Sequence, residues 1–328
     1  MRKLILHIGA HKTGTSAIQQ YLLRHKQALF DKGWFYCERP GSPTNWGHMF
    51  RIQVEPNGAR ISLGPIVLRR MLELMDSKPQ DVIFSAEDLW FLDAANVGIF
   101  CAAMAERFDQ ITIVAYVRRQ DFMTASHWLQ GGKTVQSALI FGGTMGPLEN
   151  VNPYMMRYLD YAGVVQTWQA ALPQARLLLK NYDRELFPNR DVVRDFLTTT
   201  GLDLEPDGVD QDANVAFGAT TVRFVYMLRE AGLIQKSISE ALSAGLIEIT
   251  DDKALPSREQ AAKFVEKFND SNALLASLMG KERVFSDDFT CFPQTSTVRP
   301  LDADYVARNL LALLLEATMR LDLHTASK

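Results

Sequence analysis

The stretch LILHIGAHKTGTSAI, residues 4–18, decides the fold because it joins an apolar strand to a helix through a loop bounded by glycines. Gly9 and Gly14 have the spacing of a nucleoside-triphosphate P-loop, and Ser16 keeps the hydroxyl of that motif. Thr15 stands where such a loop has its lysine, and the lysine of this chain is Lys12, inside the loop. A cation there would lie beside the terminal phosphate of a shorter ligand. The loop therefore favours a 5′-phosphate that carries one transferable group over ATP.

Strand and helix patterns alternate along the first two hundred residues. Short apolar runs predict buried parallel strands at 3–9, 34–37, 81–85, 111–117 and 176–181. Helical patterns lie near 15–31, 66–77, 96–108, from 122 onward and at 158–172, whereas 38–57 is predicted to be a loop. This alternation predicts an α/β chain, a three-layer P-loop-like fold with a central parallel sheet and its site at the carboxyl ends of the strands.

Beyond about residue 200 the strand signal fades. Helices are predicted at 220–231, 236–244, 257–278 and 302–321, the last with Asp302 as its N-cap. We therefore expect a nucleotide-binding α/β core over residues 1–200. Residues 201–328 form a mostly helical C-terminal extension, which packs on the core as part of the same domain or as a second one.

Composition agrees with an enzyme of the cytoplasm. The 328 residues are 47% hydrophobic, which is enough for a large core, and the net charge of −3 gives no sign of a nucleic-acid partner. Three widely spaced cysteines offer neither a disulfide framework nor a metal-binding pair. The longest late apolar run, 310–315, is far shorter than the ~18 residues of a membrane span. The apolar start of the chain runs directly into the glycine loop, which argues against an export signal.

Two segments resemble a known family. Gly9-x-x-Lys12-x-Gly14-Thr15 followed by an amphipathic helix resembles the 5′-phosphosulfate loop of sulfotransferases that use 3′-phosphoadenosine 5′-phosphosulfate (PAPS). Residues 111–126 resemble the family's 3′-phosphate segment, a buried strand that ends in arginine, with a serine eight residues later. Arg119-Gln120-Asp121 replaces the usual Asp-Pro, as in bacterial carbohydrate-type members. The resemblance implies that PAPS is held by Gly9, His11, Lys12, Thr13, Gly14, Thr15, Ser16, Arg118 and Ser126.

Transfer to a hydroxyl also needs a base, because an alcohol is a poor nucleophile until its proton is taken. Glu87 is the first candidate, since it follows the strand at 81–85 on the side where sites of open sheets lie. Ser85-Ala86-Glu87 also resembles the region that supplies a catalytic carboxylate in some carbohydrate sulfotransferases. His48 is the rival base. The plainer interpretations are that Glu87 caps a helix start and that His48 only packs in its loop.

The acceptor is expected to be a glycan or glycolipid, mainly because of the family resemblance. Trp46, Trp90, Phe91 and Trp128 lie near the candidate loops and could stack on sugar rings, although large aromatic residues are more often part of a core. Lipid, phenolic and small-alcohol acceptors stay open. No metal is expected, because His7 and His11 lack a third ligand.

Two other functions compete with sulfuryl transfer. An ATP-dependent P-loop phosphotransferase would need the missing lysine and an acidic magnesium ligand such as Asp88. A regulatory protein that binds a nucleotide without turnover would keep the loop but not its chemistry. An intact Lys12 and a plausible base argue against the latter.

Overall fold

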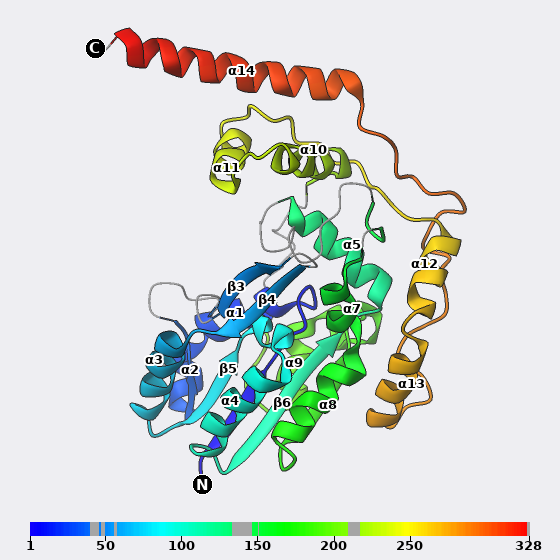
Figure 1. Ribbon diagram of the computed structural model, residues 1–328. Coiled ribbons are helices and arrows are strands. Elements are labelled where there is room, and N and C mark those ends of the chain that lie inside the picture. The colour runs from blue at the N-terminus through cyan, green and yellow to red at the C-terminus, as the bar shows by residue number, and fades with distance from the viewer. Residues whose placement is uncertain are drawn as a thin grey trace. The chain divides into compact units, whose positions relative to one another are not determined.

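Figure 1 shows the chain as a computed structural model, which describes residues 1–39, 46, 50–55, 58–132, 146–149, 151–208 and 217–326. The chain divides into two compact units that interleave along the sequence. Unit 1 comprises residues 1–123, 153–213 and 267–286, and unit 2 comprises residues 124–152, 214–266 and 287–328. The division at residue 200 stays a prediction about domains, since compactness alone does not show which parts fold independently.

Unit 1 is built on a five-stranded parallel sheet in the order β2-β5-β1-β6-β7. The strands are β1 Lys3–His7, β2 Trp34–Tyr36, β5 Asp81–Ser85, β6 Gln110–Val117 and β7 Arg176–Asn181. The predicted α/β class with a central parallel sheet is thereby confirmed. From β1 the chain moves to the sheet edge at β2, and from β6 it moves to the opposite edge at β7. The direction in which strands are added therefore reverses between the neighbouring strands β1 and β6. Open parallel sheets bind their ligands at the carboxyl ends of the strands beside such a reversal.

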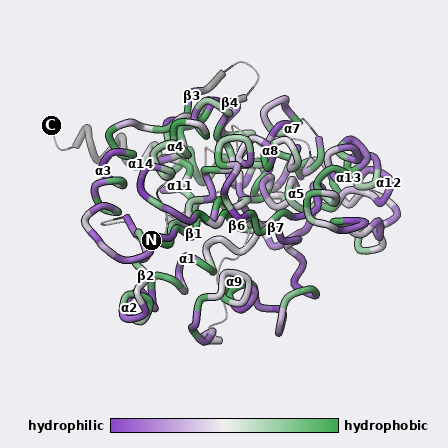
Figure 2. Tube along the Cα trace, turned by 90° about the horizontal axis from the view of Figure 1, so that it is seen from below, coloured by the Kyte–Doolittle hydropathy of each residue, from purple (hydrophilic) through white to green (hydrophobic). Residues whose placement is uncertain are grey.

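Helices cover both faces of this sheet, as the view along its edge shows (Figure 2). On one face, Ile18, Tyr21 and Leu22 form an apolar stripe at helical spacing and join the core under the sheet. On the other face, the ring of Phe84 lies 6.1 Å from that of Phe100. The first face carries α1 Thr15–Arg24, α2 Lys26–Asp31 and α9 Val192–Thr200; the second carries α3 Pro65–Asp76, α4 Ala94–Ala105 and α8 Tyr161–Ala171.

Several element boundaries differ from the sequence prediction. The structure has a hairpin of β3 Phe50–Glu55 and β4 Gly58–Leu63, of which β3 lies in the stretch predicted as loop and β4 lies just after it. The helix predicted at 15–31 is divided because His25 leaves helical geometry at ψ 16°. The helix predicted at 158–172 begins earlier and is divided into α7 Pro153–Leu159 and α8, which Asp160 caps by accepting a hydrogen bond from the backbone N–H of Gly163.

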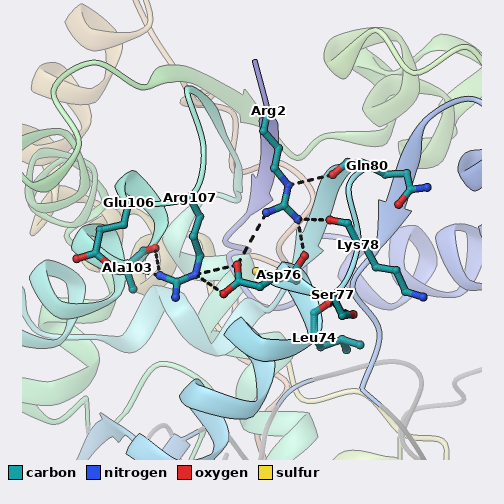
Figure 3. Close-up of polar contacts among 10 residues, drawn as sticks. Arg2, Leu74, Asp76, Ser77, Lys78, Gln80, Ala103, Glu106 and Arg107 are labelled. Carbon is teal, nitrogen blue, oxygen red and sulfur yellow. Dashed lines mark hydrogen bonds and ion pairs between the residues drawn. The ribbon is translucent and has the colours of Figure 1, made fainter.

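The amino ends of the strands are tied together by Arg2 (Figure 3). Its guanidinium donates to the backbone carbonyls of Gln80 at 3.1 Å, of Lys78 at 2.9 Å and of Met75. These carbonyls lie at the end of α3 and just beyond it, where helix carbonyls lack partners within the helix. Arg2 therefore joins the end of α3 to β1, far along the strands from the carboxyl-end loops.

The regular elements described in unit 2 are helices, joined by long irregular segments. Its helices are the later part of α5 Gln120–Gly131, then α10 Ala219–Glu230, α11 Gln235–Ser243, α12 Arg258–Glu266 and α14 Ala303–Ala326. Tyr305 packs edge-on against Phe224 at 5.6 Å, and Asp302 caps α14 as predicted by accepting a hydrogen bond from the N–H of Tyr305. The remaining long helix, α13 Asn269–Leu278, belongs to unit 1. In the described parts of the chain, no helix has both the length and the apolar character needed to cross a membrane.

Candidate active site

The loop between β1 and α1 has a fixed, sharply turned backbone. Gly9 and Gly14 have φ values of 103° and 80°, and Lys12 between them has a φ of 59°, which is uncommon outside glycine. The loop is anchored to β6, since the N–H of Ala10 donates to the carbonyl of Tyr116 at 2.8 Å and the N–H of Tyr116 donates to the carbonyl of Gly9 at 2.7 Å. Thr13 closes the turn with a 2.6 Å hydrogen bond from its hydroxyl to the carbonyl of Ala10. A strained lysine at this place is the kind of feature that functional sites retain.

The loop leads directly into the N-terminus of α1. Gly14 is the N-cap, and the first turn of α1 contains no acidic residue. The first N–H groups of a helix have no partner within the helix and carry partial positive charge, so a phosphate is favoured at this position. Thr15 is buried in this first turn, whereas Ser16 is exposed.

Both glycines of the loop are packed closely against other elements. A Cβ atom on Gly9 would lie 3.2 Å from the Cα of Glu87, which begins the 3-10 helix η2 Glu87–Phe91 after β5. A Cβ atom on Gly14 would lie 2.8 Å from Cγ1 of Val192 and 3.1 Å from Cε2 of Tyr182. The loop therefore lies between the residues that follow β5 and those that follow β7.

Glu87 is thus placed beside the loop that the sequence singled out. Its side chain is partly buried, and its Oε2 atom is buried without a hydrogen-bond partner among the described residues. An unsatisfied buried carboxylate oxygen is costly, so it indicates a group that a ligand or a transferred proton would satisfy. The rival base His48 lies outside the described residues.

His11 contacts η2 with its ring. Its Nε2 atom lies 3.2 Å from Oδ1 of Asp88, and its ring centroid lies 4.7 Å from that of Phe91. The backbone N–H of His11 donates to the hydroxyl of Tyr158 on α7 at 3.1 Å. Burial raises the pKa of Tyr158 well above its ordinary value, so its hydroxyl stays protonated.

Arg118 directly follows β6 and is held by aromatic rings. Its guanidinium carbon lies 5.4 Å from the ring centre of Phe122 and 5.8 Å from that of Tyr182. Burial lowers its pKa, against the opposing influence of Tyr182 and Asp121, yet an arginine stays charged in proteins. Among the residues that the structure describes, no carboxylate forms an ion pair or hydrogen bond with this guanidinium. A partly buried cation without a carboxylate suits a bound anion.

Arg119, which directly follows Arg118, is already paired with a carboxylate. Arg119 and Asp121 are both buried and form a bidentate pair, with Nε to Oδ1 at 3.0 Å and Nη2 to Oδ2 at 2.9 Å. Arg119 also donates to the carbonyl of Ser286 at 2.7 Å. Ser126 lies on α5 beyond the division between the two units, so its pairing with Arg118 stays a prediction.

Other polar and aromatic residues from the sequence analysis belong to the core. His7 is fully buried, its Nδ1 lies 2.8 Å from the hydroxyl of Ser85, and burial lowers its pKa to about 3. The aromatic residues considered as sugar platforms are also buried, at exposures of 1–4%. They are Trp46, Trp90, Phe91 and Trp128.

Sequence reasoning missed Tyr182 and the pairing of His11 with Asp88. Tyr182 follows β7 as Arg118 follows β6, and its N–H donates to the carbonyl of Val117 at 2.7 Å. Its place immediately after a predicted strand was the available signal, because the carboxyl ends of parallel strands meet at one edge. For His11 and Asp88 no sequence signal existed, since 77 residues separate them.

Comparison with known proteins gives limited further information. No family model matches the chain. An uncharacterized protein from Archaeoglobus fulgidus is 27% identical over 169 residues, which cover 50% of this chain and 44% of that protein. A sulfotransferase from Alicyclobacillus acidocaldarius, known from a crystal structure, aligns over 86% of this chain and 97% of its own with 16% identity and a TM-score of 0.46. At that TM-score, function has to be argued from the site itself.

Proposed function

We propose that this protein is a sulfotransferase that moves a sulfuryl group from PAPS to an acceptor hydroxyl. The observation that carries the proposal is that two positions suited to anions lie at neighbouring strand ends. The glycine-bounded loop with Lys12 follows β1, and the Arg118 guanidinium, without a carboxylate partner among the described residues, follows β6. A nucleotide with phosphates on both its 5′ and 3′ oxygens matches two such sites. Tyr182 supports the match because its ring lies beside Gly14 and 5.8 Å from the Arg118 guanidinium carbon, between the two positions.

The chemistry assigned to each group follows from its position. Lys12 and the first N–H groups of α1 would hold the 5′-phosphosulfate and stabilise the charge that grows on the leaving phosphate oxygen. The acceptor oxygen attacks sulfur as the bond from sulfur to the phosphate oxygen breaks, and Glu87 takes the acceptor's proton. Adenosine 3′,5′-bisphosphate leaves. In this scheme the loop supplies the positive charge that a magnesium ion supplies in a nucleoside triphosphatase.

The ATP-dependent alternative is less well supported by the same residues. Thr15 stands in the place of the P-loop lysine, and Asp88, the acid available for magnesium, is engaged by His11 at 3.2 Å. A non-catalytic nucleotide-binding role would not need Glu87 beside the loop.

The acceptor class rests on the family resemblance alone, and we propose a hydroxyl of a glycan or glycolipid. The buried aromatic residues give this choice no support. A cytoplasmic location is likewise proposed, supported by three cysteines that are all free thiols.

Titration with two nucleotides tests the 3′-phosphate site. In Arg118→Gln, the affinity for adenosine 3′,5′-bisphosphate should fall roughly 10- to 100-fold, because one charge-assisted contact is worth about 1.5–3 kcal/mol. Adenosine 5′-monophosphate, which has a 3′-hydroxyl, should lose little affinity. Equal losses for the two nucleotides would remove Arg118 from this role.

Single-turnover rates test the chemical roles. Lys12→Ala should lower the transfer rate by ~100-fold or more, because one preorganised donor is typically worth about 3 kcal/mol in the transition state. Glu87→Gln keeps the shape but removes the basic oxygen, so bisphosphate affinity should survive while the rate falls. If Glu87→Gln stays active and His48→Gln does not, the base is His48.

A further inference from the structure

Two residues of the 3-10 helix η2, Asp88 and Phe91, contact the ring of His11. In a 3-10 helix, residues three apart lie above one another, so Asp88 and Phe91 share one side of η2. Oδ1 of Asp88 lies 3.2 Å from Nε2 of the imidazole, and the ring centroid of Phe91 lies 4.7 Å from that of the imidazole. Because the side chains of His11 and Asp88 are only 14% and 12% exposed, their contact is shielded from water and stronger than a surface pair.

The same short helix carries Glu87, one residue before Asp88. Its backbone lies against Gly9, so closely that a Cβ atom on that glycine would be crowded at 3.2 Å from the Glu87 Cα. The loop and η2 therefore meet at two successive points, Gly9 with Glu87 and His11 with Asp88. Lys12 directly follows His11 in the loop, and Glu87 directly precedes Asp88 in η2. The contact between His11 and Asp88 therefore joins the segment that carries the lysine to the segment that carries the Glu87 carboxylate.

We propose that His11 and Asp88 are a positioning pair that fixes η2 against the phosphate loop and so sets the geometry between Lys12 and Glu87. The inference rests on the proposed function, in which Lys12 holds the leaving phosphate and Glu87 takes the acceptor's proton. Displacement of a reacting group by about 1 Å can cost on the order of 100-fold in rate. The pair thus acts on the rate of transfer through Glu87, and neither member touches the acceptor.

A second anchor keeps His11 in place on the loop side. Its backbone N–H donates to the Tyr158 hydroxyl at 3.1 Å, and the Tyr158 ring lies 4.7 Å from that of Phe91. Loss of the Asp88 carboxylate therefore leaves the loop backbone bonded to Tyr158, and nucleotide binding is expected to survive. What is lost is the polar contact between the His11 ring and η2.

The test uses PAPS with water as acceptor, so the natural acceptor is not required. This reaction breaks the bond between sulfur and the phosphate oxygen, joins sulfur to the water oxygen and yields sulfate, adenosine 3′,5′-bisphosphate and the two protons that the water gives up. Bisphosphate release is measured in a single turnover for the wild type, Asp88→Ala, His11→Ala, the double variant and Asp88→Asn. The Kd for adenosine 3′,5′-bisphosphate is measured on the same proteins. Asp93→Ala is the matched control, because Asp93 caps α4 just beyond η2 and pairs with Arg60 instead of the loop.

We expect Asp88→Ala and His11→Ala each to slow release by about 10- to 100-fold, Asp88→Ala with an unchanged Kd, and the double variant to be no slower than either single one. Asp88→Asn still accepts the imidazole N–H and should restore most of the rate. Asp93→Ala should lose stability without losing rate. Additive losses, a rate loss matched by Asp93→Ala, or no rescue by Asp88→Asn would overturn the positioning role. A wild type that neither binds the bisphosphate nor releases it would instead refute the proposed function, and the inference with it.

Discussion

Replacing Gly14 with alanine should lower both the stability of the protein and its affinity for the nucleotide, because one added methyl group has no space. Gly14 has a φ of 80°, and an alanine in this left-handed region costs about 1–2 kcal/mol. The added Cβ would also lie 2.8 Å from Val192, closer than real Cβ contacts come, and 3.1 Å from Tyr182, which is tighter than most of them. Overpacking of this kind typically costs about 1–3 kcal/mol. The sum predicts that Gly14→Ala lowers the free energy of unfolding by about 2–5 kcal/mol.

Gly33→Ala is a matched control. Gly33 has a φ of 84°, but nothing lies within 4 Å of its would-be Cβ, so only the backbone cost applies. Urea unfolding gives both stabilities, and calorimetric titration gives the Kd for adenosine 3′,5′-bisphosphate. Gly14→Ala should be the less stable variant and should bind the bisphosphate more weakly, because displacing Tyr182 moves the ring under Arg118. Equal stability losses with unchanged affinity in both variants would refute the packed-loop reasoning.

Three further predictions concern stability and reactivity. Below pH 6.5 the unfolded chain protonates His7, whereas the native chain does not until about pH 3. Across that window, His7 should therefore lower the free energy of unfolding by about 1.4 kcal/mol for each pH unit of acidification. His7→Gln, compared with the wild type by urea titration, should lack this share of the slope, and an unchanged slope would contradict the assignment. Arg2→Ala should lower the free energy of unfolding by about 2 kcal/mol, because it loses the hydrogen bonds to three backbone carbonyls. Arg69→Ala, on an exposed part of α3, should lower it by under about 0.5 kcal/mol. Equal losses would show that Arg2 does not hold the end of α3. Cys291 is exposed and should react first with a thiol reagent, well before the two buried cysteines, whose thiol pKa values burial raises; similar rates for all three would contradict their burial.

The sheet was predictable because each of its strands contains a short apolar run between helical patterns. The strand at 81–85 was predicted with its observed bounds. The hairpin of β3 and β4 was missed because its two strands mix polar with apolar residues, and its turn residues equally suit a loop. Helix breaks such as that at His25 depend on one residue's backbone angles, which periodicity does not record.

For the site, sequence indicated the loop and Arg118 because local spacing defines both. The resemblance named Arg118 and not Arg119, and the structure shows Arg119 already engaged in a bidentate contact with Asp121. The sequence did not indicate the contact of Gly9 with Glu87 or of His11 with Asp88, because residues far apart in the chain meet only when parallel strands align their ends. The aromatic residues were misleading as sugar platforms, since large rings near a loop mostly fill the core.

The central claim, that this site takes a 3′,5′-bisphosphorylated adenosine and not a triphosphate, is tested most directly by thermal unfolding with each nucleotide. A ligand that binds only the native state raises the melting temperature by mass action. The account predicts that adenosine 3′,5′-bisphosphate raises the melting temperature strongly without magnesium, and that ATP does so weakly even with it. A strong, magnesium-dependent effect of ATP with no effect of the bisphosphate would contradict the account.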